Sequence, residues 1–298
     1  MKILVAGQSG QVAKSLVLRA REQDIDLVSL GRPDLDICDP LSIDRAFEAT
    51  KPGVLINAAA YTAVDQAETD AAAAHGVNAT AAKHLASASA ERSIPIIHLS
   101  TDYVFDGSKT EAYTEEDPLA PLGVYGTSKL AGERDVAAAN PDHFILRTAW
   151  VYSPFGKNFV KTMLRLAEAR DNVGVVDDQM GNPTSALDIA DALLALAKMI
   201  NAEDVSSAYG TYHLAGTGDA TWADLAEQVF EVSQSVDGPN AEVNRITSDE
   251  FPTPVQRPKN SRLNCQKLAD TFGIRLPHWR DSSKVCVEEL LRNKDLVS

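Results

Sequence analysis

The sequence predicts an α/β fold in which a doubly wound parallel sheet is followed by a smaller C-terminal lobe. Short apolar runs alternate with longer helical segments over the first half, a glycine-rich turn follows the first run, and the pattern loosens beyond residue 150. We therefore expect residues 1–150 to form the sheet domain. Residues 151–298 are expected to form mainly the smaller lobe, with some segments returning to the first domain.

The strands are expected where the apolar runs lie, because strands buried on both faces of a parallel sheet are almost continuously apolar. They are Lys2–Ala6, Leu27–Leu30, Val54–Ala58, Ile96–Ser100 and Phe144–Thr148. Helices are expected at Val12–Arg21, Leu41–Thr50, Ala71–Ala90, Tyr125–Ala139, Ser185–Met199, Trp222–Gln234, Ser261–Phe272 and Ser282–Arg292, and irregular segments at Gly107–Gly123 and Pro252–Pro258. Ligands of such sheets bind at the carboxyl ends of the strands, so functional residues should directly follow each strand.

Composition excludes several classes of protein. The 298 residues carry 28 Lys and Arg against 42 Asp and Glu, a net charge of −14, which argues against binding to nucleic acid or to an anionic membrane. No stretch approaches the roughly 18 apolar residues of a membrane span. The three cysteines, Cys38, Cys265 and Cys286, are too scattered for a disulfide framework or a zinc site, so we expect a cytoplasmic protein.

A glycine-rich turn, Gly7-Gln8-Ser9-Gly10-Gln11-Val12-Ala13, lies between the first strand and the first helix. Gly7 permits a tight turn, and Gly10 lets the backbone approach a pyrophosphate at the helix N-terminus, where free N–H groups attract anions. The motif is short, and its alternative interpretation is an ordinary strand-to-helix turn. Its place at the start of an α/β pattern favours a nicotinamide dinucleotide.

The end of the second strand bears on which dinucleotide is used. An NAD-selective fold usually has Asp or Glu about 20 residues after the glycine turn, whereas this chain has Gly31-Arg32. Arg32 can pair with a 2′-phosphate through two N–H groups, which favours NADPH, with NADH as the alternative. An unpaired solvent-exposed Arg32 is the competing interpretation.

Tyr125 and Lys129 lie four residues apart on a predicted helix and therefore on one face. A nearby ammonium group lowers the pKa of a phenol, so the pair is expected to act as a general acid, and Lys129 can also hold ribose hydroxyls. Such a pair also occurs as an ordinary surface pair. Thr101, which follows the fourth strand, favours catalysis because its hydroxyl should reach the same edge and hydrogen-bond a substrate carbonyl.

These motifs together resemble the extended short-chain dehydrogenase/reductase family, whose sheet is Rossmann-like. The resemblance covers nearly the whole chain, in segments Asn57–Glu68, Leu99–Gly107, Pro121–Glu133, Arg147–Tyr152, Asp178–Thr184 and Arg257–Leu263. It implies that Tyr125 donates the proton, assisted by Lys129 and Thr101. It also implies cofactor contacts from Gly7, Ser9, Gly10, Gln11, Val12, Arg32, Asp36, Ile37, Ala58, Ala60, Tyr61, Thr62, Tyr125 and Lys129, and substrate contacts from Thr101, Asp102, Trp150, Val64, Asn158 and Arg257.

The activity that the resemblance implies is reduction of the 4-keto group of dTDP-4-dehydro-β-L-rhamnose by NADPH. Another nucleotide-sugar reductase or epimerase is an alternative, as is a non-catalytic subunit similar to the regulatory subunit of methionine adenosyltransferase. A dehydratase is disfavoured, because such enzymes usually read Thr-Asp-Glu where this chain has Thr101-Asp102-Tyr103.

The oligomeric state stays open between monomer and homodimer. Some family members dimerise through Mg²⁺ held partly by an acid on the first helix, where this chain has Val12-Ala13-Lys14-Ser15-Leu16, so the role of Mg²⁺ is left open and no metal ligand is assigned. Asp65 is expected to cap a helix rather than touch substrate, and His98 to be a hydrogen-bonded core residue.

Overall fold

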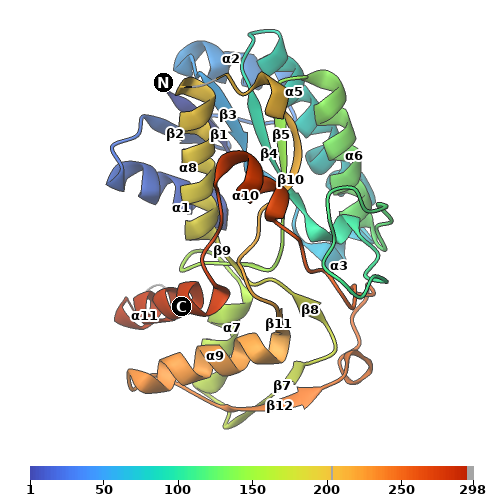
Figure 1. Cartoon of the computed structure of the whole chain (residues 1–298), viewed down its shortest axis with the longest axis vertical. Helices are drawn as coiled ribbons and strands as arrows, with labels where there is room; N and C mark the ends of the chain where they lie inside the picture. Colours follow the sequence, from blue (N-terminus) through green and yellow to red (C-terminus); the bar gives the residue numbers. More distant parts are fainter. Residues whose placement is uncertain (203, 294–298) are drawn as a thin grey trace.

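A six-stranded parallel sheet forms the centre of the computed structural model, which describes residues 1–202 and 204–293 (Figure 1). The strand order is β10-β5-β4-β3-β1-β2, so the order reverses beside β1, as in doubly wound sheets. The strands are β1 (Ile3–Ala6), β2 (Leu27–Leu30), β3 (Val54–Asn57), β4 (Ile96–Thr101), β5 (His143–Thr148) and β10 (Gly210–His213), all paired in parallel. The predicted fold class is confirmed, and β10 is a strand that the sequence analysis missed.

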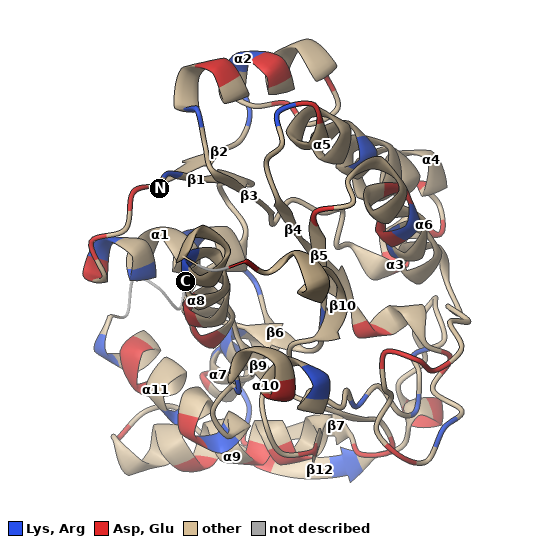
Figure 2. Cartoon of the chain, turned by 45° about the horizontal axis from the view of Figure 1, so that its top comes forward, with Lys and Arg blue, Asp and Glu red and all other residues tan. Residues whose placement is uncertain are grey.

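Alternation along the strands explains why helices cover both faces of the sheet. Ile3 and Val5 pack with α1 (Gln11–Glu22) and α8 (Ala186–Ala202) on one face. Leu4 and Ala6 pack on the other face, which is covered by α2 (Pro40–Thr50), α5 (Ala81–Ala90) and α6 (Val124–Ala139). Charged residues gather on the outer helices and loops, whereas β1, β3 and β4 carry none (Figure 2).

One predicted helix, Ala71–Ala90, is interrupted. The chain forms α4 (Ala71–His75), a π-helical turn η1 (Gly76–Thr80) and then α5, preceded by the short α3 (Val64–Ala67). The wide turn presses the backbone of Asn78 against α6, where a Cβ on Gly132 would lie 2.0 Å from the Asn78 carbonyl oxygen. The Asn78 side chain exchanges hydrogen bonds with the Tyr61 backbone at 2.8 and 3.1 Å. The uniform alanine pattern carried no sign of this tertiary contact.

The smaller lobe has its own core between three helices and a two-stranded parallel sheet. Its elements are α7 (Phe159–Ala167), α9 (Trp222–Ser235), α11 (Trp279–Arg292), β7 (Asn172–Val176) and β12 (Glu242–Ile246). Short pairs connect the lobe to the main sheet: β6 (Val151–Tyr152) with β9 (Thr184–Ser185), and β8 (Met180–Gly181) with β11 (Ala220–Thr221). The single-turn helices are η2 (Asp102–Val104), η3 (Ser206–Ala208) and η4 (Ser248–Glu250).

Two predicted helices of the C-terminal half have different starts. The helix expected at Ser261–Phe272 is the shorter α10 (Gln266–Phe272), because Asn260 and Leu263 form β-bridges with Met180 and Tyr113. Helix α11 begins three residues earlier than expected, at Trp279, where the His278 side chain accepts a bond from Arg280 N–H. Gly107–Gly123 and Pro252–Pro258 contain no named helix or strand apart from the bridge at Tyr113.

The C-terminal half also completes the first core. Helix α8 packs against α1, and β10 extends the sheet beyond β5 (Figure 1). The division into residues 1–150 and 151–298 stays a prediction. No helix among the described residues is both long and apolar enough to cross a membrane.

Candidate active site

The glycine turn opens α1 with backbone N–H groups directed toward the carboxyl edge of the sheet. Gly7 has φ of 124°, which favours glycine, and a Cβ there would lie 3.2 Å from the Ala58 backbone. Gly10 is the N-cap of α1, without a side-chain cap, and a Cβ on it would meet nothing within 4 Å. No acid lies in the first turn. Open space beside uncapped N–H groups fits a pyrophosphate.

The other predicted cofactor residues follow β2 and β3 at the same edge. Arg32 is exposed just after β2, and the Asp36 carboxylate accepts a bond from Cys38 N–H at 3.0 Å. After β3, Tyr61 is held in place by Asn78. Of the predicted residues not yet placed, Ser9 lies in the turn after β1, Ile37 in the segment after β2, and Ala60 and Thr62 in the segment after β3. Val12 lies in the first turn of α1. Their contacts with a cofactor stay predictions.

Gln11 joins the glycine turn to the second lobe. Its Oε1 accepts bonds from Ser153 Oγ at 2.9 Å and from Asn158 Nδ2 at 3.0 Å. Asn158 is also the N-cap of α7, where its Oδ1 accepts from Lys161 N–H. The amide of Asn158, predicted to contact substrate, is therefore already bonded within the protein.

Thr101, Asp102 and Tyr125 converge at the carboxyl end of β4. Thr101 Oγ1 donates to Asp102 Oδ1 at 3.0 Å, and the Thr101 hydroxyl lies near the Tyr125 phenol. Tyr125 lies in the first turn of α6, and its ring meets the ring of Tyr103 edge to face at 5.6 Å. The structure thus brings the predicted Thr101 hydroxyl and Tyr125 phenol together.

The expected lowering of the Tyr125 pKa is not seen. Burial raises the pKa of Tyr125 well above its usual value, the nearby Thr101 hydroxyl opposes the rise, and the Asp102 carboxylate adds to it. Lys129 Nζ instead donates to the Leu99 carbonyl oxygen at 2.6 Å. Helical spacing placed the two side chains on one face, but the expectation that Lys129 lowers the pKa of Tyr125 was wrong for this arrangement.

Burial also shifts the pKa values of Lys129 and Asp102 toward pH 7. It lowers the pKa of Lys129 to about 8, against the opposing effect of the Glu133 carboxylate. It raises the pKa of Asp102 to about 6, although the Ser261 and Thr101 hydroxyls limit the rise. Among the described residues, Asp102 Oδ2 has no hydrogen-bond partner in the structure. Buried groups poised near neutral pH are typical of catalytic sites.

A buried ion pair between Glu133 and Arg147 lies next to the Thr101, Asp102, Tyr125 and Lys129 side chains. Arg147 on β5 binds the Glu133 carboxylate through Nε at 2.9 Å and Nη2 at 2.7 Å, and Ser100 Oγ donates to Glu133 Oε1 at 2.5 Å. The two charged side chains are only 4% and 5% exposed, so neither is screened by water. The sequence analysis missed this pair, although Glu133 follows Lys129 by one helical turn.

Trp150 lies beneath the second lobe rather than in the core. Its indole stacks on Trp222 of α9, with ring centroids 3.6 Å apart and planes at 5°, and its Nε1 donates to Ser261 Oγ at 3.1 Å. Its φ of 47° is in the left-handed region. Trp222 covers one face of the indole, and Gly181 packs so close to the ring that a Cβ there would lie 2.3 Å from Trp150 Cε2. No pattern in the sequence indicated Trp222.

Arg257 crosses from the Pro-rich segment to the first domain. Its Nη2 lies 2.7 Å from Asp65 Oδ1, and its guanidinium lies 5.9 Å from the centroid of the Tyr103 ring. The expectation that Asp65 caps a helix was wrong: Ala63 is the N-cap of α3, and Asp65 in the first turn pairs with Arg257 instead. Arg257 Nη1 is buried without a partner among the described residues, and Val64 begins α3 beside this pair.

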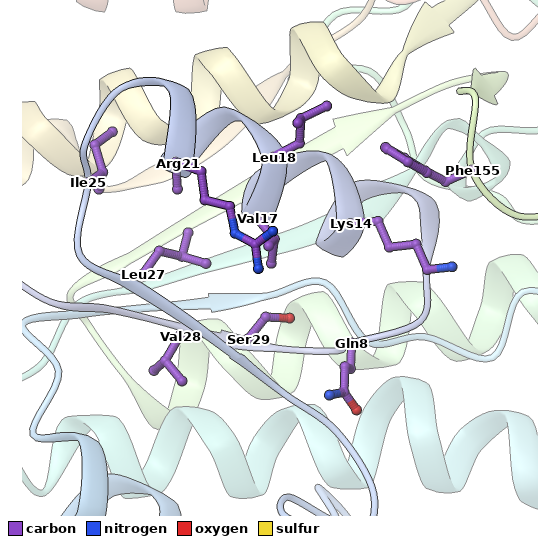
Figure 3. A pocket seen from close by; sticks show the side chains of 11 residues that line it. Gln8, Lys14, Val17, Leu18, Arg21, Ile25, Leu27, Val28, Ser29 and Phe155 are labelled. Carbon is purple, nitrogen blue, oxygen red and sulfur yellow. The ribbon is translucent and has the colours of Figure 1, made fainter. Parts of the chain in front are cut away.

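A groove of about 750 Å³ lies between α1 and β2 (Figure 3). Lys14 and Phe155 lie at one end, Arg21 and Ile25 lie at the other, and Gln8 of the glycine turn borders it. None of the predicted catalytic residues lines this groove.

The comparisons with known proteins decide the family. The profile described as "RmlD substrate binding domain" matches residues 1–292. A dTDP-4-dehydrorhamnose reductase of Sinorhizobium fredii is 47% identical over 291 residues, which are 98% of either chain. That of Escherichia coli K12 is 40% identical, covering 97% of this chain and 98% of its own. The chain belongs to the dTDP-4-dehydrorhamnose reductase family.

Solved structures of the reductase family agree. The crystal structure of a dTDP-4-dehydrorhamnose reductase from Clostridium acetobutylicum superposes with a TM-score of 0.90 at 38% identity, covering 98% of this chain and 100% of its own. That from Bacillus anthracis, in complex with NADP, has a TM-score of 0.87 at 33% identity, covering 97% and 100%. This membership confirms the resemblance found in the sequence and the Rossmann-type fold.

No ligand set for the Mg²⁺ ion considered in the sequence analysis is found among the described residues. Within residues 1–202 and 204–293, no three side chains of His, Cys, Asp or Glu lie together in a way that could hold a metal ion. The roles of Thr101, Asp102, Tyr125 and Lys129 in the chemistry stay predictions.

Proposed function

We propose that this protein reduces the 4-keto group of dTDP-4-dehydro-β-L-rhamnose to give dTDP-L-rhamnose, with NADPH as the reductant. Membership of the reductase family supports this activity. The observation that carries the proposal is the convergence of Thr101, Asp102 and Tyr125 at the edge of the sheet where the glycine turn opens. This edge is where doubly wound sheets place their ligands.

NADPH fits the glycine turn. Gly10 and Gln11 would hold the pyrophosphate by backbone N–H groups, with Gly7 allowing the close turn, and the residues after β2 and β3 would hold the adenosine. The bound cofactor supplies the hydride that the 4-keto carbon accepts. Arg32 is exposed just after β2, at the place where NAD-selective folds usually have Asp or Glu, which supports a preference for the 2′-phosphate of NADPH.

The protein's own contribution is to supply and steady a proton. Tyr125 Oη gives its proton to the 4-oxygen as negative charge develops there, and Thr101 orients the phenol. A phenol of raised pKa keeps its proton until a stronger base, the developing alkoxide, lies beside it. Lys129, whose pKa burial lowers to about 8, stays mostly protonated at pH 7 and can return a proton to Tyr125.

The substrate is held from both parts of the chain. Trp150 would flank the sugar, and Arg257 Nη1, buried without a partner among the described residues, supports contact with the diphosphate. We propose a reducing compartment such as the cytoplasm, because Cys38, Cys265 and Cys286 are all free. With its net charge of −14, the protein is not proposed to bind nucleic acid, and it acts as a monomer or a homodimer.

The direct test is turnover. Purified protein mixed with NADPH and dTDP-4-dehydro-β-L-rhamnose should consume the absorbance of the reduced nicotinamide, with dTDP-L-rhamnose as the product by NMR. An epimerised 4-keto product without loss of NADPH would contradict the proposal in favour of an epimerase. A flat signal with a well-folded protein would favour a non-catalytic binding subunit.

Replacing Arg32 with Ala tests the cofactor preference. We expect KM for NADPH to rise about tenfold, because a charge-assisted hydrogen bond contributes about 1.5–3 kcal/mol, while KM for NADH stays nearly constant. Steady-state kinetics with both cofactors provide the measurement, and Arg45→Ala, an exposed arginine on α2, is the matched control. Equal losses with NADPH and NADH would refute the role of Arg32.

A further inference from the structure

His98 lies at the centre of β4, between the core and the candidate active site. It is only 1% exposed and has two polar neighbours: Asn57 Nδ2 at 3.0 Å from its Nδ1, and Lys129 Nζ at 3.5 Å from its Nε2. The sequence analysis expected a hydrogen-bonded core residue, which the Asn57 contact confirms. The position of Lys129 beyond the other ring nitrogen was not foreseen.

The hydrogen bonds of Asn57 determine the tautomer of His98. Asn57 Oδ1 accepts the Ala59 N–H at 3.1 Å, which identifies the other amide atom, a nitrogen, as the one that faces His98. An amide nitrogen only donates, so His98 Nδ1 must accept and carries no proton. In a neutral ring the proton therefore lies on Nε2, on the side of Lys129.

This tautomer is unfavourable for a charged Lys129. An Nε2–H group and an ammonium group are both donors, so at 3.5 Å they cannot satisfy each other. Among the described residues, only the Leu99 carbonyl oxygen accepts from Nζ, at 2.6 Å. A neutral amine, in contrast, offers a lone pair to Nε2–H. The arrangement thus favours loss of a proton from Lys129.

The remaining charges around Lys129 act in opposite directions. Glu133, one turn further along α6, favours the ammonium, but it is itself neutralised by Arg147 from β5. From the next segment, Asp102 faces Tyr125. Burial and Lys129 together hold the pKa of His98 well below its usual value, so the ring stays neutral. None of these groups changes the fact that His98 presents a donor, not an acceptor, to Lys129 Nζ.

We propose that Asn57 and His98 form a positioning pair whose outward-facing Nε2–H weakens the hold of Lys129 on its proton. The role rests on the proposed reduction: after Tyr125 Oη has given its proton to the sugar alkoxide, the Nζ–H bond of Lys129 breaks as the Oη–H bond re-forms. Water then restores the proton of Lys129. His98 neither gains nor loses a proton in this sequence and touches no substrate.

The first test reads the tautomer without any turnover. In protein carrying ¹⁵N-histidine, long-range ¹H–¹⁵N spectra distinguish Nδ1–H from Nε2–H, and His98 is identified by the signal missing from His98→Gln. We expect a neutral Nε2–H ring from pH 6 to pH 9. An Nδ1–H ring or an imidazolium ion would overturn the proposal, whatever reaction the protein catalyses.

The second test measures the titration of Lys129. His98→Gln places an amide oxygen near the former Nε2, which can accept from the ammonium, so the midpoint of the ¹³Cε signal of Lys129 should rise by about one pH unit. Asn57→Leu removes the donor to Nδ1, so the ring can carry its proton on Nδ1 and present Nε2 as an acceptor to Lys129. The Lys129 midpoint should therefore rise in this variant as well. Lys129→Met assigns the signal.

The outcomes separate the two proposals. If the protein reduces the sugar, the alkaline limb of its kcat/KM profile should move upward with the midpoint in both variants. An unchanged Lys129 midpoint in folded His98→Gln and Asn57→Leu would overturn the positioning role even if turnover is normal. If the parent shows no turnover but the midpoints shift as expected, the proposed function is wrong and the effect of Asn57 and His98 on Lys129 is still supported.

Discussion

Tyr125→Phe should lower kcat by about 10²–10⁴-fold, the usual contribution of a positioned proton donor. The variant loses only the phenolic oxygen, so the ring can keep its edge-to-face contact with Tyr103. Because the hydride acceptor then develops negative charge with no proton nearby, the loss should fall on kcat and leave KM for the sugar within a few-fold. Stopped-flow measurement of nicotinamide absorbance provides the rate of the reductive step.

A matched control separates chemistry from the loss of a hydroxyl group. Tyr152 is also buried, and its hydroxyl donates to the Trp279 carbonyl oxygen at 3.3 Å in the second lobe. Tyr152→Phe should keep kcat within a few-fold and cost about 1 kcal/mol of stability. Equal rates for Tyr125→Phe and the parent would show that another group, such as Asp102 or water, supplies the proton.

Glu133→Leu should lower the free energy of unfolding by about 3–5 kcal/mol, the second largest effect that we expect. The substitution leaves the Arg147 guanidinium buried without its carboxylate, and Ser100 loses its acceptor. It also removes the negative charge that favours the ammonium form of Lys129, so the pKa of Lys129 should fall further. Urea unfolding monitored by circular dichroism measures the stability.

The double variant Glu133→Leu, Arg147→Met tests whether the unpaired charge is the cause. Replacing both partners with apolar side chains removes the desolvation cost of the pair, so most of the lost stability should return. If the double variant is as unstable as the sum of the two single variants, the loss comes from poor packing of the two new side chains rather than from a stranded charge. The Arg147→Met single variant completes this cycle.

Much of the sheet could be predicted because its signals are local. Uninterrupted apolar runs identified β1 to β5 to within one residue at each end. In contrast, β10 is short and rich in polar residues, and it is a strand only because β5 offers an unpaired edge. Similarly, β7 pairs with β12 across about 70 residues of chain, and neither run is apolar enough to stand out.

The candidate site shows the same division. The glycine turn and the Tyr125–Lys129 spacing are local patterns, so the sequence revealed them. The Trp150–Trp222 stack, the Glu133–Arg147 pair and the Asp65–Arg257 pair join distant segments, and nothing in one sequence indicates such pairings. The pKa of Tyr125 was misjudged for a related reason, since burial depends on the whole fold and outweighs the neighbour that the spacing suggests.

Because α8 and β10 pack into the first domain, the chain cannot be truncated at residue 150 to give a stable nucleotide-binding fragment. A fragment that stops at residue 150 would retain the entire glycine turn. It would, however, expose the apolar face of α1 that packs against α8 and leave the backbone groups of β5 that pair with β10 without hydrogen-bond partners. Unpaired strand edges pair with strands of other chains, so such a fragment would aggregate rather than bind nucleotide. Anyone seeking a minimal nucleotide-binding piece would have to splice residues 186–213 back onto it.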